Sequence, residues 1–300
     1  MKIGILKSVG LAAAISLTTV FATQAQQQTD SSNNVVGALE KIASESKCIA
    51  YNWKDRGLAP RSYITGMGLV YARALCNRNS DDVQLASAPV DSSSVEMDAL
   101  AAYQQDLTDA GMHSETPVDI LRHTYALLIG LGMRESSGKY CEGRDVNQCF
   151  TTPNSAEAGL LQTSYAAHIA ILAFLKKQYT DNKRSCLKEA FGGSTITCKI
   201  EESNNQKCPW ATSDVTGAEG KDPGADWQRM TKECPAFAVE YAAVVLRKNG
   251  GTNGEFGPVR RHEVELLPEC DTMLKNIQGF VESHPEACSG PAPFSRPLMP

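Results

Sequence analysis

The distribution of apolar residues along the chain predicts a protein built mainly of α-helices. Apolar residues recur at the three- and four-residue spacing of a buried helix face in several segments. These segments are residues 35–46, 62–77, 95–110 and 164–179, and the stretches that open at Pro235 and Pro268. Alternation of the strand type is scarce, and only residues 194–200 fit one arm of a small hairpin. Residues 79–94 and 182–226 are rich in small polar residues and are predicted to be loops.

The best-defined helix begins after Thr116. Thr is a good N-cap, Pro117 suits the first helical position, and Asp119 suits the positive end of the helix dipole. Residues 126–133 are apolar all round, which predicts burial on every side. Gly130 and Gly132 weaken the helix intrinsically, so we expect them to admit a close neighbour; Gly138 is the expected stop.

The first residues have the features of a secretory signal. Lys2 and Lys7 precede an apolar stretch over residues 9–21, and small residues lead to an expected cleavage after Ala25. No other segment approaches a membrane span, so we expect an exported, soluble protein. The predicted organisation is a signal (1–25), a flexible lead-in (26–36), one helical domain (37–288) and a loose proline-rich tail (289–300).

Ten cysteines in an exported chain predict a disulfide framework of about five bridges if all of them pair. Cys141 and Cys149 would close a short loop. No Cys-x-x-Cys pair occurs and the five histidines lack a metal-ligand spacing, so we predict no metal site and no cofactor. The sequence also lacks a glycine-rich phosphate loop, a nucleophile elbow and a His-Glu-x-x-His zinc helix.

The charge of the chain is negative. The net charge of −5 becomes about −7 once the two lysines of the signal are removed. An acidic protein is not steered toward nucleic acid or an anionic membrane, so neither is an expected partner.

Two motifs carry the chemistry. The run Gly132-Met133-Arg134-Glu135-Ser136-Ser137-Gly138 is followed by Glu157-Ala158-Gly159-Leu160-Leu161-Gln162. Their order and separation resemble the lysozyme-like superfamily of lytic transglycosylases and goose-type lysozymes, with Leu161 where that family usually has Met. The resemblance covers residues 121–168 and implies a mainly α, lysozyme-like fold with disulfide-stapled loops.

The resemblance implies a role for each matching residue. Glu135 would be the general acid that protonates the glycosidic oxygen, and its place at the end of an apolar helix favours a raised pKa. Ser136 and Ser137 would shape the turn or contact sugar, and Gly159 would let the backbone approach the glycan. Gln162 would hydrogen-bond in the cleft. The family's tyrosine would correspond to Tyr241, although the surrounding sequence departs from the usual pattern.

The second carboxylate would decide the mechanism. Asp145 and Glu157 are the candidates that would activate water or stabilise positive charge on the sugar. We expect a monomeric hydrolase acting on the β-1,4 linkages of peptidoglycan or a related amino-sugar glycan. The net charge favours an N-deacetylated glycan, which carries ammonium groups. The alternatives are a lytic transglycosylase that uses the same acid to form an anhydro sugar, and a glycan-binding module without turnover.

Structural interpretations compete with these roles. Glu135 could end its helix by pairing with Arg134 or Arg144, and Asp145 could simply pair with Arg144. Glu157 could be a first-turn helix acid and Gln162 a core amide. We interpret three histidines as structural or solvated rather than catalytic: His123, His168 and His262. The loop aromatics could stack on sugar or cover the core: Tyr140, Phe150, Trp210 and Trp227.

Overall fold

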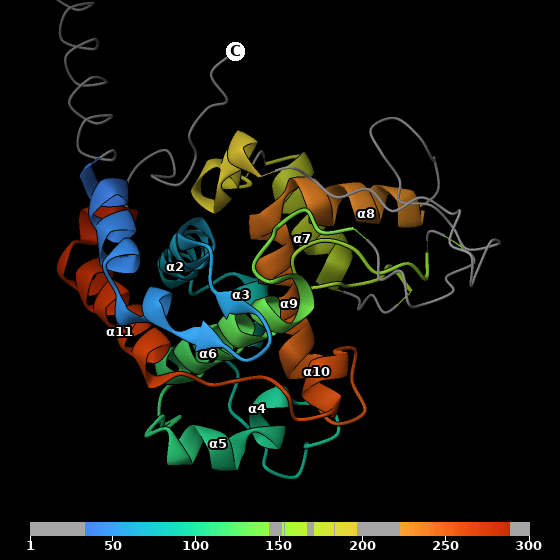
Figure 1. The fold of residues 1–300 in the computed structure, drawn as a ribbon, viewed down its shortest axis with the longest axis horizontal. Helices are drawn as coiled ribbons and strands as arrows, with labels where there is room; N and C mark the ends of the chain where they lie inside the picture. Colours follow the sequence, from blue (N-terminus) through green and yellow to red (C-terminus); the bar gives the residue numbers. More distant parts are fainter. Residues whose placement is uncertain are drawn as a thin grey trace, which may run out of the picture.

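The computed structural model describes residues 34–143, 152, 154–166, 171–182, 184–196 and 223–288, and this part of the chain is mainly helical, as predicted (Figure 1). The expected signal, the tail and residues 167–170 and 197–222 lie outside the described residues. Asp145, Cys149 and Phe150 also lie outside them.

A helix over residues 34–44 comes first, which places the start of helical structure inside the predicted lead-in. In chain order the other elements are η1 (Lys47–Ala50), β1 (Asn52–Trp53), β2 (Gly57–Leu58), α2 (Arg61–Cys76), α3 (Asp81–Ala86), α4 (Ala99–Ala102), α5 (Gln104–Asp109), α6 (Pro117–Ser136), α7 (Ile171–Thr180), η2 (Lys188–Phe191), η3 (Gly193–Thr195), α8 (Pro223–Glu233), α9 (Pro235–Lys248), α10 (Gly257–Arg260), α11 (Pro268–Ser283) and η4 (Pro285–Cys288). The two short strands pair antiparallel.

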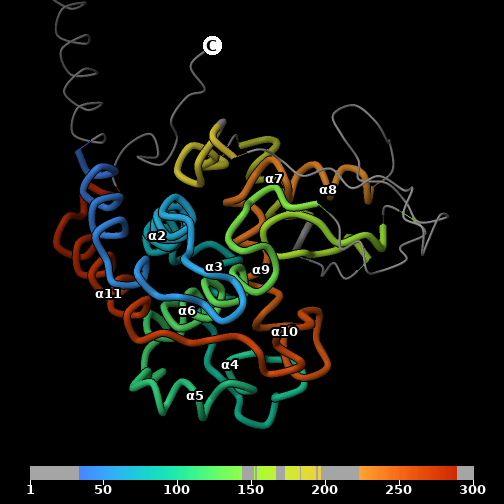
Figure 2. The backbone as a smooth tube through the Cα atoms, in the orientation of Figure 1, coloured from blue at the N-terminus to red at the C-terminus, as the bar shows by residue number. Residues whose placement is uncertain are grey.

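The core lies where α2, α6 and α9 pack against one another, and α11 covers α2 and α6 (Figures 1 and 2). These three central helices are buried over most of their length because their apolar residues are not confined to one face. The close approach expected at two glycines of α6 is confirmed. A Cβ on Gly130 would overlap the backbone carbonyl of Glu265, and one on Gly132 would overlap the hydroxyl of Tyr63.

Both ends of α6 lie where the capping residues of the sequence predicted them. The Thr116 hydroxyl accepts the N–H of Asp119 at 3.2 Å, and the Asp119 carboxylate accepts the N–H of Thr116 at 3.1 Å, which is a complete capping box. At the other end Ser137 and Gly138 adopt left-handed φ values of 55° and 74°. Gly138 also faces the ring of Tyr63, which a Cβ would approach to 2.8 Å, so this stop has no room for a side chain.

Three disulfides link segments far apart in the sequence: Cys48–Cys270, Cys76–Cys288 and Cys186–Cys234. Cys141 is disulfide-bonded as well. Cys149 lies outside the described residues, so the predicted Cys141–Cys149 bridge stays a prediction.

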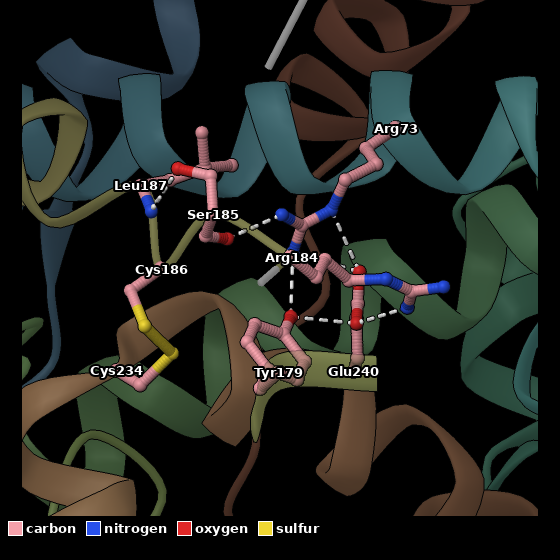
Figure 3. The surroundings of a disulfide bond; sticks show 8 residues. All are labelled: Arg73, Tyr179, Arg184, Ser185, Cys186, Leu187, Cys234 and Glu240. Carbon is pink, nitrogen blue, oxygen red and sulfur yellow. Dashed lines mark hydrogen bonds and ion pairs between the residues drawn. A yellow bond between two sulfur atoms is a disulfide. The ribbon is translucent and has the colours of Figure 1, made fainter. Parts of the chain in front are cut away.

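A buried ionic network lies beside the Cys186–Cys234 bridge (Figure 3). Arg73 of α2 donates to Glu240 of α9 at 2.8 Å and to the Tyr179 hydroxyl of α7 at 2.7 Å. Arg184 donates to the other Glu240 oxygen at 2.7 Å. Burial alone would raise the pKa of Glu240, but the charges of Arg73 and Arg184 outweigh it and hold that pKa below its ordinary value. The network therefore joins three helices through one ionised carboxylate.

Several predicted loops and helices differ from the observed elements. The predicted loop over residues 79–94 contains α3, whose buried Val83 and Ala86 lie on a helix that packs against α9. The single helix predicted over residues 95–110 is two short helices, α4 and α5, separated at Tyr103. That ring is fully buried and its hydroxyl accepts the N–H of Val264 at 3.1 Å, so contacts with a distant segment fix the break.

The region 182–226 also holds more structure than predicted. Phe191 of η2 is fully buried, and its ring lies where a Cβ on Gly66 would come within 2.5 Å. The expected hairpin arm at residues 194–200 begins in η3 instead, and residues 197–200 lie outside the described part. The helix predicted over residues 164–179 is observed from Ile171. Among the described residues, no helix combines the length and apolar character that crossing a bilayer requires.

Candidate functional site

Glu135 lies in the last turn of α6, and its side chain is half-buried. The next residue, Ser136, is buried, and its hydroxyl donates to the carbonyl of Gly132 at 3.1 Å. Ser137 is half-buried in the left-handed conformation that ends the helix. Ser136 therefore bonds back into its own helix, and Ser137 forms the turn that ends it. Glu135 projects from the point where a buried helix reaches the surface.

Hydrogen bonds join the second sequence motif to the chain shortly after the first. The backbone N–H of Gly159 donates to the carbonyl of Glu142 at 3.0 Å. The side-chain amide of Gln162 donates to the carbonyls of Gly143 and Gly159 at 2.9 and 3.0 Å. Glu142 and Gly143 belong to the segment that continues from the end of α6. The second motif is therefore held against the chain that leaves Glu135.

The turn that carries Gln162 is tightly constrained. Gly159 has a φ of 80°, and a Cβ there would lie 2.6 Å from the backbone oxygen of Thr231. An isolated bridge pairs Ala158 with Thr163 across the turn, and the Trp227 indole N–H donates to the carbonyl of Thr163 at 3.1 Å. Gly159 was expected to let the backbone approach a glycan, whereas the segment that approaches it closely is the backbone of helix α8. Gln162 is buried, and its amide nitrogen donates to backbone carbonyls of the protein itself.

Arginine side chains gather around the end of α6. Arg56 of the β1–β2 turn donates to the carbonyl of Arg134. The Arg134 guanidinium lies 3.3 Å from Glu263, and Arg261 lies 3.0 Å from the same carboxylate. The pKa of Arg261 is raised by its hydrogen bond to Glu263 and, to a smaller extent, by the nearby carboxylate of Glu135. The Arg261 side chain is 59% exposed, so solvent reaches it although it pairs with Glu263.

A further carboxylate reaches the second motif from the loop between α9 and α10. Glu255 is half-buried, and its Oε1 lies 3.3 Å from the backbone nitrogen of Ser164, which donates to it. Burial raises the pKa of Glu255; the hydrogen bond from Ser164 and the charge of Arg260 lower it, but burial has the larger effect. No sequence signal marked Glu255, because its contact with Ser164 spans 91 residues.

The other predicted site residues are placed as follows. Glu157 is half-buried near the start of the second motif. Tyr241 is 1% exposed, and its ring packs edge-on against Trp227 with the centroids 4.6 Å apart. Asp145 and His168 lie outside the described residues. Trp227 is buried in the same cluster, so it covers the core.

The histidines that the structure describes have structural surroundings. His123 is fully buried, its Nδ1 lies 2.7 Å from the hydroxyl of Ser114, and burial lowers its pKa to about 4. His262 stacks on the ring of Tyr103 and lies 2.8 Å from Asp106. In the described part of the chain, no three His, Cys, Asp or Glu side chains come together to hold a metal ion.

A cavity of about 290 Å³ opens away from both motifs, between residues 85–98 and the end of α9. Its charged lining includes Arg247 and Asp98, which are 2.9 Å apart. Arg247 also donates to the carbonyls of Ala86 and Ala88 at 2.9 and 2.8 Å. Because this guanidinium is already satisfied, the cavity is a weaker candidate site than the surroundings of Glu135.

No family model, curated protein or solved structure matches this chain. The resemblance to the lysozyme-like superfamily therefore rests on the two motifs.

Proposed function

We propose that this protein is an exported glycosidase that cleaves β-1,4 amino-sugar linkages of peptidoglycan, with Glu135 as the general acid. The observation that carries the proposal is the pair of contacts that hold the second motif against the chain shortly after the first: Gln162 to Gly143 at 2.9 Å and Gly159 to Glu142 at 3.0 Å. A protein that uses both motifs in one cleft requires them to be neighbours. Two short sequences that match by coincidence need not be neighbours in the fold.

Glu135 has the position that proton donation requires. It emerges from a helix whose preceding turns are fully buried, and it stays half-exposed, so a glycosidic oxygen can approach it. In the proposed reaction its proton goes to that oxygen as the bond to the sugar carbon breaks. The left-handed turn at Ser137 and Gly138 ends the helix directly after Glu135.

The charged side chains around Glu135 favour some substrates over others. Four arginines lie around the end of α6 and the neighbouring α10: Arg56, Arg134, Arg260 and Arg261. Guanidinium groups bind carboxylates strongly, and peptidoglycan carries carboxylates on its peptide stems. This local charge favours an anionic glycan, whereas the net charge of about −7 favours an N-deacetylated one. We give the local charge more weight because screening reduces the effect of distant charges.

Digestion of purified cell walls tests the proposal. Acetylated and N-deacetylated walls are incubated with the protein, and the masses of the soluble products are measured. We expect release of muropeptides, faster from the acetylated wall, with products that have gained one water. Products that lack the added water would identify a lytic transglycosylase that uses the same acid. Absence of cleavage on every wall would contradict the enzymatic proposal and favour a glycan-binding module.

A further inference from the structure

The side chain of Glu255 contacts the chain just after the second motif. Its Oε1 accepts the backbone N–H of Ser164 at 3.3 Å, and Ser164 follows Gln162 by two residues. Ser164 is itself buried. Glu255 therefore borders the turn that holds the second motif.

The loop that carries Glu255 is fixed before any ligand binds. The N–H groups of Gly250 and Thr252 donate to the carbonyls of Met97 and Val95 at 2.8 and 2.9 Å. The N–H of Glu255 itself donates to the carbonyl of Asn249 at 2.7 Å. A carboxylate on such a loop is held in one place, as a group that must meet a reacting atom has to be.

Glu255 and Glu135 flank the same short helix. α10 begins at Gly257, two residues after Glu255, and packs against α6, which carries Glu135 (Figure 1). Arg261, directly after α10, interacts electrostatically with Glu135. The fold thus links the loop that carries Glu255, through α10 and Arg261, to the helix that carries Glu135.

We propose that Glu255, rather than Asp145 or Glu157, is the second carboxylate of the reaction and acts as the general base. This inference rests on the proposed function. Glu135 gives its proton to the glycosidic oxygen, which keeps the electron pair of the breaking bond to the anomeric carbon. A water oxygen bonds to that carbon, and one of its protons goes to Glu255. One water is consumed, and exchange with solvent restores both carboxyl groups.

The surroundings of Glu255 suit this role. Burial raises its pKa, which makes the ionised carboxylate a stronger base. A base that activates water on the face opposite the leaving group gives a product with inverted configuration at the anomeric carbon.

Substitution of Glu255 tests the assignment, with Glu265→Gln as the matched control. Glu265 also uses its carboxylate to join distant segments, because it accepts the N–H of Lys54 at 2.9 Å. We expect Glu255→Gln to lower kcat by roughly 10²- to 10⁴-fold with a small change in KM, and to abolish the acidic limb of the pH profile. Glu255→Ala should regain rate with added azide and release a glycosyl azide. Glu265→Gln should keep the wild-type kcat and both limbs of the pH profile.

Other outcomes overturn the assignment. If Glu255→Gln keeps kcat and the acidic limb of the pH profile, Glu255 is structural. The same conclusion follows if azide does not rescue Glu255→Ala and only thermal stability falls. Loss of that limb in Glu157→Gln or Asp145→Asn instead would give the role to one of those residues. An inactive wild-type protein would refute the proposed function itself. An active wild type whose rate does not depend on Glu255 would refute only the assignment of Glu255.

Discussion

The side-chain amide of Gln162 donates a hydrogen bond to the backbone carbonyl of Gly143 at 2.9 Å. This contact joins the turn of the second motif to the chain that leaves the general acid candidate, Glu135. The amide nitrogen is therefore occupied by the protein itself, and Gln162 supports the wall of the proposed cleft. A buried carbonyl without that donor would cost about 1–3 kcal/mol, so the amide has a structural reason to be there.

Gly159→Ala should destabilise the protein and reduce glycan cleavage. The new Cβ would meet the backbone oxygen of Thr231 at 2.6 Å, and the φ of 80° is strained for alanine. Gly111→Ala is the control, because its φ of 73° is similar but nothing lies within 4 Å of the added Cβ. Thermal unfolding should show a loss larger for Gly159→Ala by about 1–3 kcal/mol. Equal losses would mean that the turn can move away from α8.

Arg261→Gln should extend activity to higher pH. The guanidinium of Arg261 interacts with the carboxylate of Glu135, and a nearby cation favours the ionised form of an acid. Without that cation the carboxyl group keeps its proton to higher pH, and a general acid works while protonated. The alkaline limb of the kcat/KM profile should therefore move up.

The control for this shift is Arg78→Gln. Arg78 pairs with Glu282 at 3.1 Å and is 43% exposed, which matches the Arg261–Glu263 pair in kind. Its removal should leave the pH profile unchanged. An unchanged profile in Arg261→Gln as well would mean that the proton lost in the alkaline limb does not come from Glu135.

Glu240→Gln should lower the free energy of unfolding by about 3–5 kcal/mol, because it leaves Arg73 and Arg184 buried without their carboxylate. Glu282→Gln, which breaks an exposed pair, should cost about 0–1 kcal/mol. Denaturant unfolding of both variants measures the difference. Similar losses would mean that other groups compensate the buried arginines.

The direction of the Glu240 pKa shift also predicts how the stability of the protein changes in acid. This pKa is lowered in the folded protein, so its stabilising contribution is complete above the pKa of the unfolded chain. It is lost as the pH falls through the folded-state pKa. The stability of the wild type should therefore fall steeply in acid, and Glu240→Gln should show a shallower fall.

Local signals predicted the parts of the fold that depend on local physics. Thr116 and Asp119 specify the start of α6, and Gly138 specifies its end, because capping and left-handed turns involve neighbours in sequence. The helices that open at Pro235 and Pro268 were predicted for the same reason. The short helix α3 was missed because its stability comes from burying Val83 and Ala86 near α9, which no local pattern encodes.

The candidate site was predicted in part. The sequence predicted roles for Glu135 and Gln162 from their motifs, and in the structure Gln162 bonds to Gly143, on the chain that follows the motif of Glu135. It could not identify Arg261 or Glu255, because charged residues in a polar stretch have no periodicity that points to a distant neighbour. The contact between Glu255 and Ser164 depends on how α9 and α10 pack.

The most direct test of the account is the rate of muropeptide release by Glu135→Gln compared with wild type. The substitution keeps the shape of the side chain and removes its transferable proton, and Glu96→Gln serves as an exposed control. We predict that wild type and Glu96→Gln digest the wall while Glu135→Gln, equally folded by circular dichroism, loses at least about 10²-fold in kcat. Retention of the wild-type rate by Glu135→Gln would contradict the account.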